Sequence, residues 1–135
     1  MTKLLQRLRD ASRSGVYRAG TADAVLEVTA GTDLDVALIE CGGKVLDDIA
    51  RALDFPQWFG GNWDALEDSL GDLSWRAGAG HVLLFRSYPS GDELGVLIDV
   101  LASVAEYWAE RGKPFFAVLV DPARKLRLPE LYRSA

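Results

Sequence analysis

The chain reads Phe55-Pro-Gln-Trp-Phe-Gly-Gly-Asn-Trp-Asp-Ala-Leu-Glu-Asp-Ser-Leu70 in its most informative segment. Pro56 lacks an amide hydrogen and cannot extend a strand ladder, and the pair Gly60-Gly61 permits unusual backbone angles. Asn62 is a good N-cap residue, so we expect a helix to begin at Trp63. The segment is therefore predicted to be an irregular loop that leads directly into a helix.

The predicted helix is acidic on one face. Asp64, Asp68 and Asp72 follow one another at a spacing of four residues and share this face, with Glu67 at its edge. Like charges at this spacing cost about 0.2–0.5 kcal/mol per pair in an isolated helix, and no basic residue of the helix offsets them. The opposite face is apolar and consists of Trp63, Leu66, Leu70 and Leu73.

Aromatic residues surround the acidic face in the sequence. Between Arg51 and Arg76 there is no Lys or Arg, but there are five acidic and five aromatic residues. A charged helix face is most often only solvated, and Trp63 is expected to lie in the core. Carboxylates of one sign beside a glycine loop with Trp58 and Phe59 are nevertheless typical of an interface. We therefore interpret the segment as a binding site for a cationic partner.

The remainder of the chain alternates between strand and helix patterns. Three apolar runs, at residues 35–40, 81–85 and 115–120, are predicted to be buried strands. Helices are expected after Gly42-Gly43, from Trp63, and from Ser90, where Ser90-Gly-Asp-Glu93 fits a capping box. This alternation predicts the α/β class, with a small three-stranded parallel sheet packed with helices.

We expect the chain to be organised in three parts. Residues 1–33 are predicted to be an N-terminal extension packed on or beside the core, with a helix at 2–13, a short strand at 15–20, and a helix or a strand at 22–29. Residues 34–120 are predicted to form the main domain. Residues 121–135 are expected to run over the surface as a C-terminal tail.

The bulk composition fits one soluble domain. The chain has 135 residues, of which 49% are hydrophobic and 26% are charged, and its net charge is −5. This charge disfavours direct binding of nucleic acid, which requires clustered Lys and Arg. No apolar run is long enough for a membrane span, and the first residues do not resemble a secretory signal. We therefore expect a cytoplasmic monomer.

Catalytic and metal sites are not predicted. Cys41 is interpreted as a small core residue, and His81, the single histidine, as a structural one. The sequence has no catalytic triad set, zinc-ligand spacing or Walker A loop. The alternative is an enzyme in which Asp64 and Asp68 act as general acid and base, or bind Mg²⁺ together with Glu67. We predict no enzymatic activity, no cofactor and no metal.

Residues 55–70 resemble the barstar family, whose members are intracellular inhibitors of barnase-type ribonucleases. The shared pattern is an apolar residue, Pro, a variable residue, two aromatic residues, Gly, a variable residue, Asn, an apolar residue, Asp-Ala-Leu and a second Asp. The order of strands and helices agrees over roughly residues 34–120. The resemblance implies a compact α/β domain with a three-stranded parallel sheet, which binds a small secreted ribonuclease and plugs its active site.

The resemblance also implies which residues contact the ribonuclease. Asp64 and Asp68 match the two carboxylates that enter the phosphate-binding cleft of the enzyme. Trp58 and Phe59 match the aromatic pair of the binding loop, and Gly60 matches its glycine. The predicted partner-binding surface consists of Trp58, Phe59, Gly60, Gly61, Asn62, Asp64, Glu67, Asp68, Asp72 and Trp75.

The chain departs from the family pattern at several of these positions. Trp58 stands in place of a tyrosine, Glu67 replaces a tryptophan, and Trp75 resembles the tryptophan after the helix at a different spacing. A glutamate on the long helix of the family aligns with either Glu106 or Tyr107. These departures concern the identity of the partner more than the fold.

Two alternatives to a ribonuclease inhibitor are compatible with these residues. The first is an adaptor or immunity protein of the same fold that binds a different basic protein or toxin without inhibiting RNA cleavage. The second is a nucleic-acid mimic that blocks a DNA-binding protein. The acidic face permits this second alternative, but the aromatic loop gives it no support.

Overall fold

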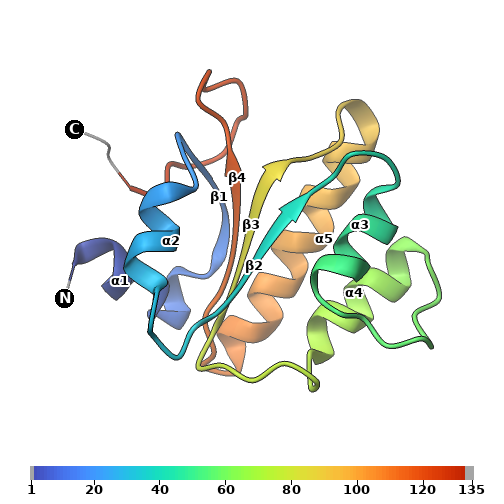
Figure 1. The fold of residues 1–135 in the computed structure, drawn as a ribbon, viewed down its shortest axis with the longest axis horizontal. Helices are drawn as coiled ribbons and strands as arrows, with labels where there is room; N and C mark the ends of the chain where they lie inside the picture. Colours follow the sequence, from blue (N-terminus) through green and yellow to red (C-terminus); the bar gives the residue numbers. More distant parts are fainter. Residues whose placement is uncertain (1, 133–135) are drawn as a thin grey trace.

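Residues 2–132 are described by a computed structural model of the chain (Figure 1). Its order of elements confirms the predicted alternation of strands and helices. In chain order these elements are α1 (Lys3–Leu8), η1 (Ala11–Arg13, a 3₁₀ helix), β1 (Gly15–Ala19), α2 (Asp23–Thr29), β2 (Asp35–Glu40), α3 (Val45–Ala52), α4 (Trp63–Asp72), β3 (His81–Ser87), α5 (Gly91–Glu110) and β4 (Phe115–Val120).

The strands form one parallel sheet in the order β1-β4-β3-β2. The α/β class is confirmed, but the predicted number of three strands is wrong, because the sheet has four. β1 pairs along its whole length with β4, from Gly15 opposite Phe116 to Ala19 opposite Val120. The sequence of β1 conceals this pairing because the strand has only five residues and includes a charged Arg18.

Helices cover both faces of the sheet (Figure 1). On one face, α3, α4 and α5 enclose a core to which the strands contribute Leu83 and Phe85. The predicted apolar stripe of α4 is confirmed, since Leu66 and Leu70 are fully buried in this core. Trp63 is partly buried and packs against the same core. The acidic face of α4 therefore points away from the sheet.

The opposite face of the sheet is covered by α1 and α2 (Figure 1). Leu8 and Val25 from these helices are buried against Phe116 and Val118 of β4. Successive residues of a strand point to opposite faces, so β4 supplies side chains to both cores. Residues of the predicted N-terminal extension thus contribute both a strand and a layer of helices.

Residues 121–135 were expected to run over the surface, but part of this segment pairs with the sheet. The backbone of Arg18 donates to the Pro129 carbonyl (2.9 Å) and accepts from the Leu131 amide (3.0 Å). The Arg18 guanidinium also pairs with Glu130 at 3.0 Å. Residues 129–131 therefore line the outer edge of β1, and the Leu131 side chain is fully buried. Met1 and residues 133–135, parts of the predicted extension and tail, lie outside the described residues.

Helix ends agree with the sequence at some positions and differ at others. The predicted helix at 2–13 is divided, because Asp10 accepts a hydrogen bond from the Ser12 amide (3.0 Å) and caps a separate 3₁₀ turn. The segment at 22–29 is helical. Ser90 is the N-cap residue of α5, but its side chain makes no capping hydrogen bond, so the predicted capping box is wrong.

Candidate functional site

The position of the acidic face of α4 is determined by the residues that cap the two ends of the helix. Asn62 caps the first turn as predicted, because its Oδ1 accepts a hydrogen bond from the Ala65 amide at 2.7 Å. The helix ends at Asp72, and its C-cap residue Leu73 is 2% exposed and adopts a left-handed conformation with φ 48°. A left-handed conformation is uncommon for a residue other than glycine, and burial of the leucine side chain holds it. The register of the exposed carboxylates is therefore fixed by the core beneath them.

The four carboxylates of α4 are all exposed to solvent. These residues are Asp64, Glu67, Asp68 and Asp72. Within residues 2–132, no ion pair joins any of them to a basic side chain. Asp64 in the first turn is favoured by the helix dipole, whereas Asp72 in the last turn is not. The surface thus carries one sign of charge that the described part of the chain does not neutralise.

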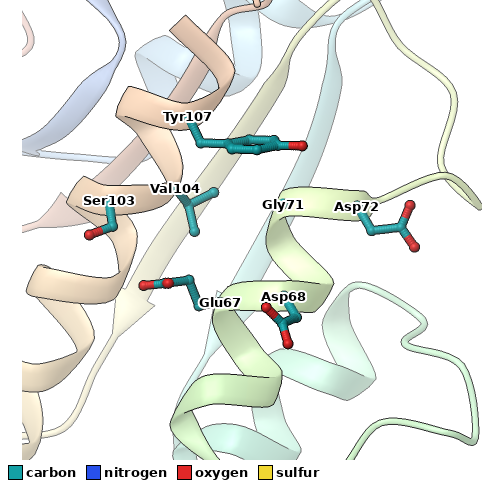
Figure 2. A pocket seen from close by; sticks show the side chains of 7 residues that line it. All are labelled: Glu67, Asp68, Gly71, Asp72, Ser103, Val104 and Tyr107. Atoms are coloured by element: carbon teal, nitrogen blue, oxygen red, sulfur yellow. The ribbon is translucent and has the colours of Figure 1, made fainter. Parts of the chain in front are cut away.

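A groove separates this acidic face from α5 (Figure 2). Its volume is about 470 Å³. A hydrogen bond from Trp108 Nε1 to the Leu70 carbonyl (2.8 Å) joins the two helices. Of the two candidate positions on α5, Tyr107 lines the groove, whereas Glu106 is exposed and is not part of its lining. The complete lining is Glu67, Asp68, Gly71, Asp72, Ser103, Val104 and Tyr107.

Part of this groove could not be identified from the sequence. Glu67, Asp68 and Asp72 were predicted site residues and Tyr107 was one of two candidates on α5, but Gly71, Ser103 and Val104 were not predicted. The available signal was the spacing of Ser103 and Tyr107 on α5, which places them on one side of the helix. Which side of α5 faces α4 depends on tertiary packing that the spacing alone does not give.

The aromatic loop before α4 presents one side chain to solvent. Trp58 is 65% exposed, whereas Phe55, Phe59 and Trp75 are partly buried against the core. The ring centroids of Trp58 and Trp75 are 6.1 Å apart in an edge-to-face arrangement. Phe55 contacts both Phe59 (4.9 Å) and Trp75 (5.7 Å) in the same manner. Of the predicted aromatic contacts, Trp58 is therefore the most accessible; Trp75 packs against it, and Phe59 packs against Phe55.

The two glycines of the loop, Gly60 and Gly61, differ in backbone conformation and in their contacts. Gly61 has φ +72°, a conformation that L side chains rarely adopt, and no atom lies near the position of an added Cβ. An added Cβ on Gly60 would lie 3.5 Å from Ala65 Cβ, which is an ordinary contact. Gly61 is therefore required by the turn that leads to Asn62, and Gly60 leaves the loop backbone accessible beside α4.

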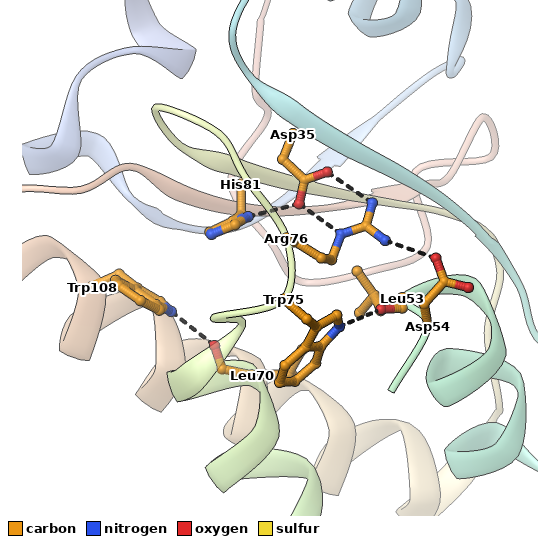
Figure 3. Close-up of polar contacts among 8 residues, drawn as sticks. All are labelled: Asp35, Leu53, Asp54, Leu70, Trp75, Arg76, His81 and Trp108. Atoms are coloured by element: carbon orange, nitrogen blue, oxygen red, sulfur yellow. Dashed lines mark hydrogen bonds and ion pairs between the residues drawn. The ribbon is translucent and has the colours of Figure 1, made fainter. Parts of the chain in front are cut away.

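A partly buried polar network holds the other end of this loop (Figure 3). Arg76 donates to both carboxylate oxygens of Asp35 at 2.8 Å, and His81 Nδ1 lies 2.8 Å from Asp35 Oδ2. Arg76 also pairs with Asp54 at 3.6 Å, where the loop begins. Beside this network, Trp75 Nε1 donates to the Leu53 carbonyl at 2.9 Å. The network thus connects β2, β3 and both ends of the segment that carries the site.

Protonation in this network is set by burial and by hydrogen bonding. An ionised carboxylate only accepts hydrogen bonds, so His81 carries its proton on Nδ1. Nε2 of His81 is buried and has no partner within the described residues. Burial lowers the pKa of His81 below its usual 6.5, although the hydrogen bond to Asp35 acts in the opposite direction. His81 is thus a neutral, structural residue at neutral pH.

Residues 2–132 do not provide the features of several other kinds of site. Burial, with a contribution from Asp48, raises the pKa of the Cys41 thiol to about 11, so this thiol stays protonated at neutral pH. Among the described residues, no group of three or more His, Cys, Asp or Glu side chains is placed to hold a metal ion. None of the described helices combines the length and the apolar character that crossing a membrane requires.

These elements define a parallel α/β domain with an acidic helix face beside an exposed tryptophan. The sequence profile of one family, described as Barstar (barnase inhibitor), matches residues 29–120. The match spans more than half of the chain, and this protein therefore belongs to the barstar family. Comparisons with curated proteins and with solved structures found no match. The matched region includes the site and β2, β3 and β4, whereas β1 and residues 121–132 lie outside it.

Proposed function

We propose that this protein inhibits a small, basic, secreted ribonuclease by placing the acidic face of α4 in the cleft that binds RNA phosphates. The observation that carries the proposal is the set of four exposed α4 carboxylates, without ion-pair partners among residues 2–132, next to the exposed Trp58. Membership of a family described as barnase inhibitors supports the same function.

The proposed mechanism is the replacement of a phosphate by a carboxylate. A ribonuclease cleft must be cationic to hold RNA, and a carboxylate can form charge-assisted hydrogen bonds with its Arg, Lys and protonated His side chains. Asp68, one turn into α4, occupies the phosphate position, and Asp64 meets neighbouring backbone or basic groups. Neither aspartate performs catalysis in this proposal. The protein acts without a cofactor, in the cytoplasm and as a monomer.

The aromatic loop adds apolar contact at the rim of the cleft. Trp58, which packs against Trp75, covers the rim and excludes water from the carboxylate contacts, which strengthens them. The acidic surface also accelerates encounter with a basic partner, and this acceleration decreases as the salt concentration rises. Both electrostatic effects are known from the barnase–barstar complex itself, so they are expectations from the family and not independent predictions for this chain.

The test is inhibition of a panel of barnase-type ribonucleases by the wild-type protein, by Asp68→Ala and by Glu27→Ala. Glu27 is exposed on α2, on the opposite side of the sheet, and its substitution removes the same charge. Truncating one partner of a desolvated charge pair costs about 2–5 kcal/mol, so Asp68→Ala is expected to inhibit far more weakly than Glu27→Ala.

Two other outcomes of this inhibition panel would change the proposal. Equal inhibition by Asp68→Ala and wild type would remove Asp68 from the interface. Binding of a basic protein without inhibition of RNA cleavage would favour the alternative of an adaptor or immunity protein. Circular dichroism of each variant distinguishes loss of binding from loss of fold.

A further inference from the structure

The groove between α4 and α5 has an apolar floor as well as an acidic rim. Gly71 has no side chain, and an added Cβ there would lie 3.8 Å from Tyr107 Cε2, so the tyrosine ring packs close to the backbone of α4. Val104 completes the floor. Figure 2 shows the Tyr107 ring above Gly71, with Glu67 and Asp68 below it. A side chain that enters the groove therefore meets an aromatic ring on one side and carboxylates on the other.

The Tyr107 ring is held in place by its neighbours on α5. The guanidinium carbon of Arg111 lies 3.5 Å from the ring centroid, and Arg111 Nη1 donates to the Tyr107 carbonyl at 2.9 Å. Trp108 contacts the same ring edge to face at 5.5 Å. Arg111 lies one turn further along the helix than Tyr107, whereas Ser103 and Val104 lie one turn before it. Arg111 therefore approaches the ring from the C-terminal side of α5, and it is not part of the groove lining, which includes Ser103 and Val104 on the N-terminal side.

We propose that this groove receives an arginine side chain of the partner in preference to a lysine, and that Tyr107 determines the preference. The inference rests on the proposed function only in taking the partner to be a basic protein. A planar guanidinium can stack on an aromatic ring while its edge donates to carboxylates, here those of Asp68 and Asp72. The lysine ammonium is a compact, strongly hydrated charge and gains less from the ring.

The charges around the groove are compatible with this occupant. Three acidic residues line it, and no basic residue does so. The charge of Arg111 opposes a second cation, but Arg111 is exposed and water screens its charge. The contact between Arg111 and the Tyr107 ring, 3.5 Å from its centroid, also shows that this ring can pack against a guanidinium.

The experiment is an NMR titration of the labelled, full-length protein with N-acetyl-arginine amide and, separately, N-acetyl-lysine amide. The two probes carry the same charge, so a difference between them reports the guanidinium. We expect the amide signals of Asp68, Gly71 and Tyr107 to shift with both probes, and the arginine derivative to bind with an apparent Kd about two- to fivefold lower.

Substitutions at Tyr107 assign the preference to the aromatic ring. Tyr107→Leu keeps an apolar side chain and is expected to bring the ratio of the two Kd values to about one. Tyr107→Phe keeps the ring and is expected to retain the wild-type ratio. The inference is overturned if wild type binds both probes equally, if Tyr107→Leu keeps the preference, or if the groove signals do not respond to either probe.

This measurement does not depend on the ribonuclease panel. Arginine preference without inhibition of any ribonuclease would support the groove and contradict the proposed inhibitor function. Inhibition by a protein that shows no arginine preference would support the inhibitor function and contradict the role of Tyr107.

Discussion

The two faces of the sheet are built by similar apolar packing but differ in charge and in surface shape. The side of the sheet covered by α3, α4 and α5 carries the groove and the exposed Trp58. The other side is covered by α1 and α2, and Leu131 is fully buried in the core there. Residues 34–120 contain 14 acidic and six basic residues, and the remaining residues contain six acidic and nine basic ones. The acidic character thus belongs to the part of the chain that carries the site.

This difference implies that the residues that determine stability are not those that carry the proposed function. β3 and β4 contribute side chains to both cores, so a loss of packing on either face weakens the whole domain. The exposed carboxylates of α4 touch neither core, and their removal is expected to leave the fold intact. Substitutions on the α1–α2 face should therefore change stability, and substitutions on the outer surface of α4 should change binding.

The largest effect on stability is expected on the face of the sheet that is covered by α1 and α2. Leu131→Ala removes a fully buried side chain and should lower the free energy of unfolding by about 2–5 kcal/mol, measured by urea denaturation. The control Lys125→Ala alters an exposed residue of the same segment and should change stability by less than about 0.5 kcal/mol. Equal effects of the two substitutions would contradict the packing of residues 129–131 against β1.

Acid is expected to weaken the network beneath the loop. The pKa of His81 is lower in the folded protein than its unfolded value of 6.5, so neutral His81 stabilises the fold above about pH 6.5 and this contribution falls as the pH decreases. Burial raises the pKa of Asp35, but hydrogen bonds from Arg76 and His81 outweigh it and hold the pKa below 3.8. The Asp35 contribution is therefore lost at lower pH, as the pH falls below 3.8.

This pH dependence is tested by urea denaturation of wild type and His81→Gln between pH 7.5 and about pH 5. His81 packs against Trp108 and faces the charges of Asp35, Arg76 and Lys113. Wild type should lose stability over this range, and His81→Gln should lose less, whatever its stability at neutral pH. Identical pH dependence of the two proteins would show that His81 does not titrate in the folded state as described.

The smallest effect on stability is expected at the exposed tryptophan. Trp58→Ala should change the free energy of unfolding by less than about 0.5 kcal/mol, yet weaken binding of the partner by about 2 kcal/mol. Trp75→Phe removes the indole donor to the Leu53 carbonyl and should lower stability by about 1 kcal/mol. If Trp58→Ala destabilises the protein more than Trp75→Phe, Trp58 is part of the core and not of the exposed surface.

The sequence predicted the elements that depend on local patterns. The cap at Asn62, the buried stripe of Leu66 and Leu70, and the exposed aspartates of α4 all follow from helical spacing and capping chemistry. The four-stranded sheet did not follow, because the short strand expected at residues 15–20 was assigned to the N-terminal extension, and its place in the sheet depends on pairing with β4 and with residues 129–131. Long-range pairing of this kind leaves no periodic signal in either segment.

The site was predicted only in part, because some of its residues come together only through tertiary packing. The acidic and aromatic residues lie within one short segment of the sequence, so their proximity was evident. Tyr107 belongs to a helix that is distant in the sequence, and its place in the groove depends on how α5 packs on α4. The distinction between the exposed Trp58 and the partly buried Phe59 and Trp75 also required the tertiary structure, since all three are aromatic residues close to α4 in the sequence.

The most direct test of the proposed inhibitor function is competition between this protein and a nucleotide for one ribonuclease. A barnase-type ribonuclease that the protein binds is titrated calorimetrically, alone and in the presence of an active-site mononucleotide. If α4 occupies the phosphate position, the apparent Kd of the protein will rise in proportion to the nucleotide concentration. An affinity that is unchanged when the enzyme is saturated with nucleotide would contradict the account, because the acidic face would then bind elsewhere.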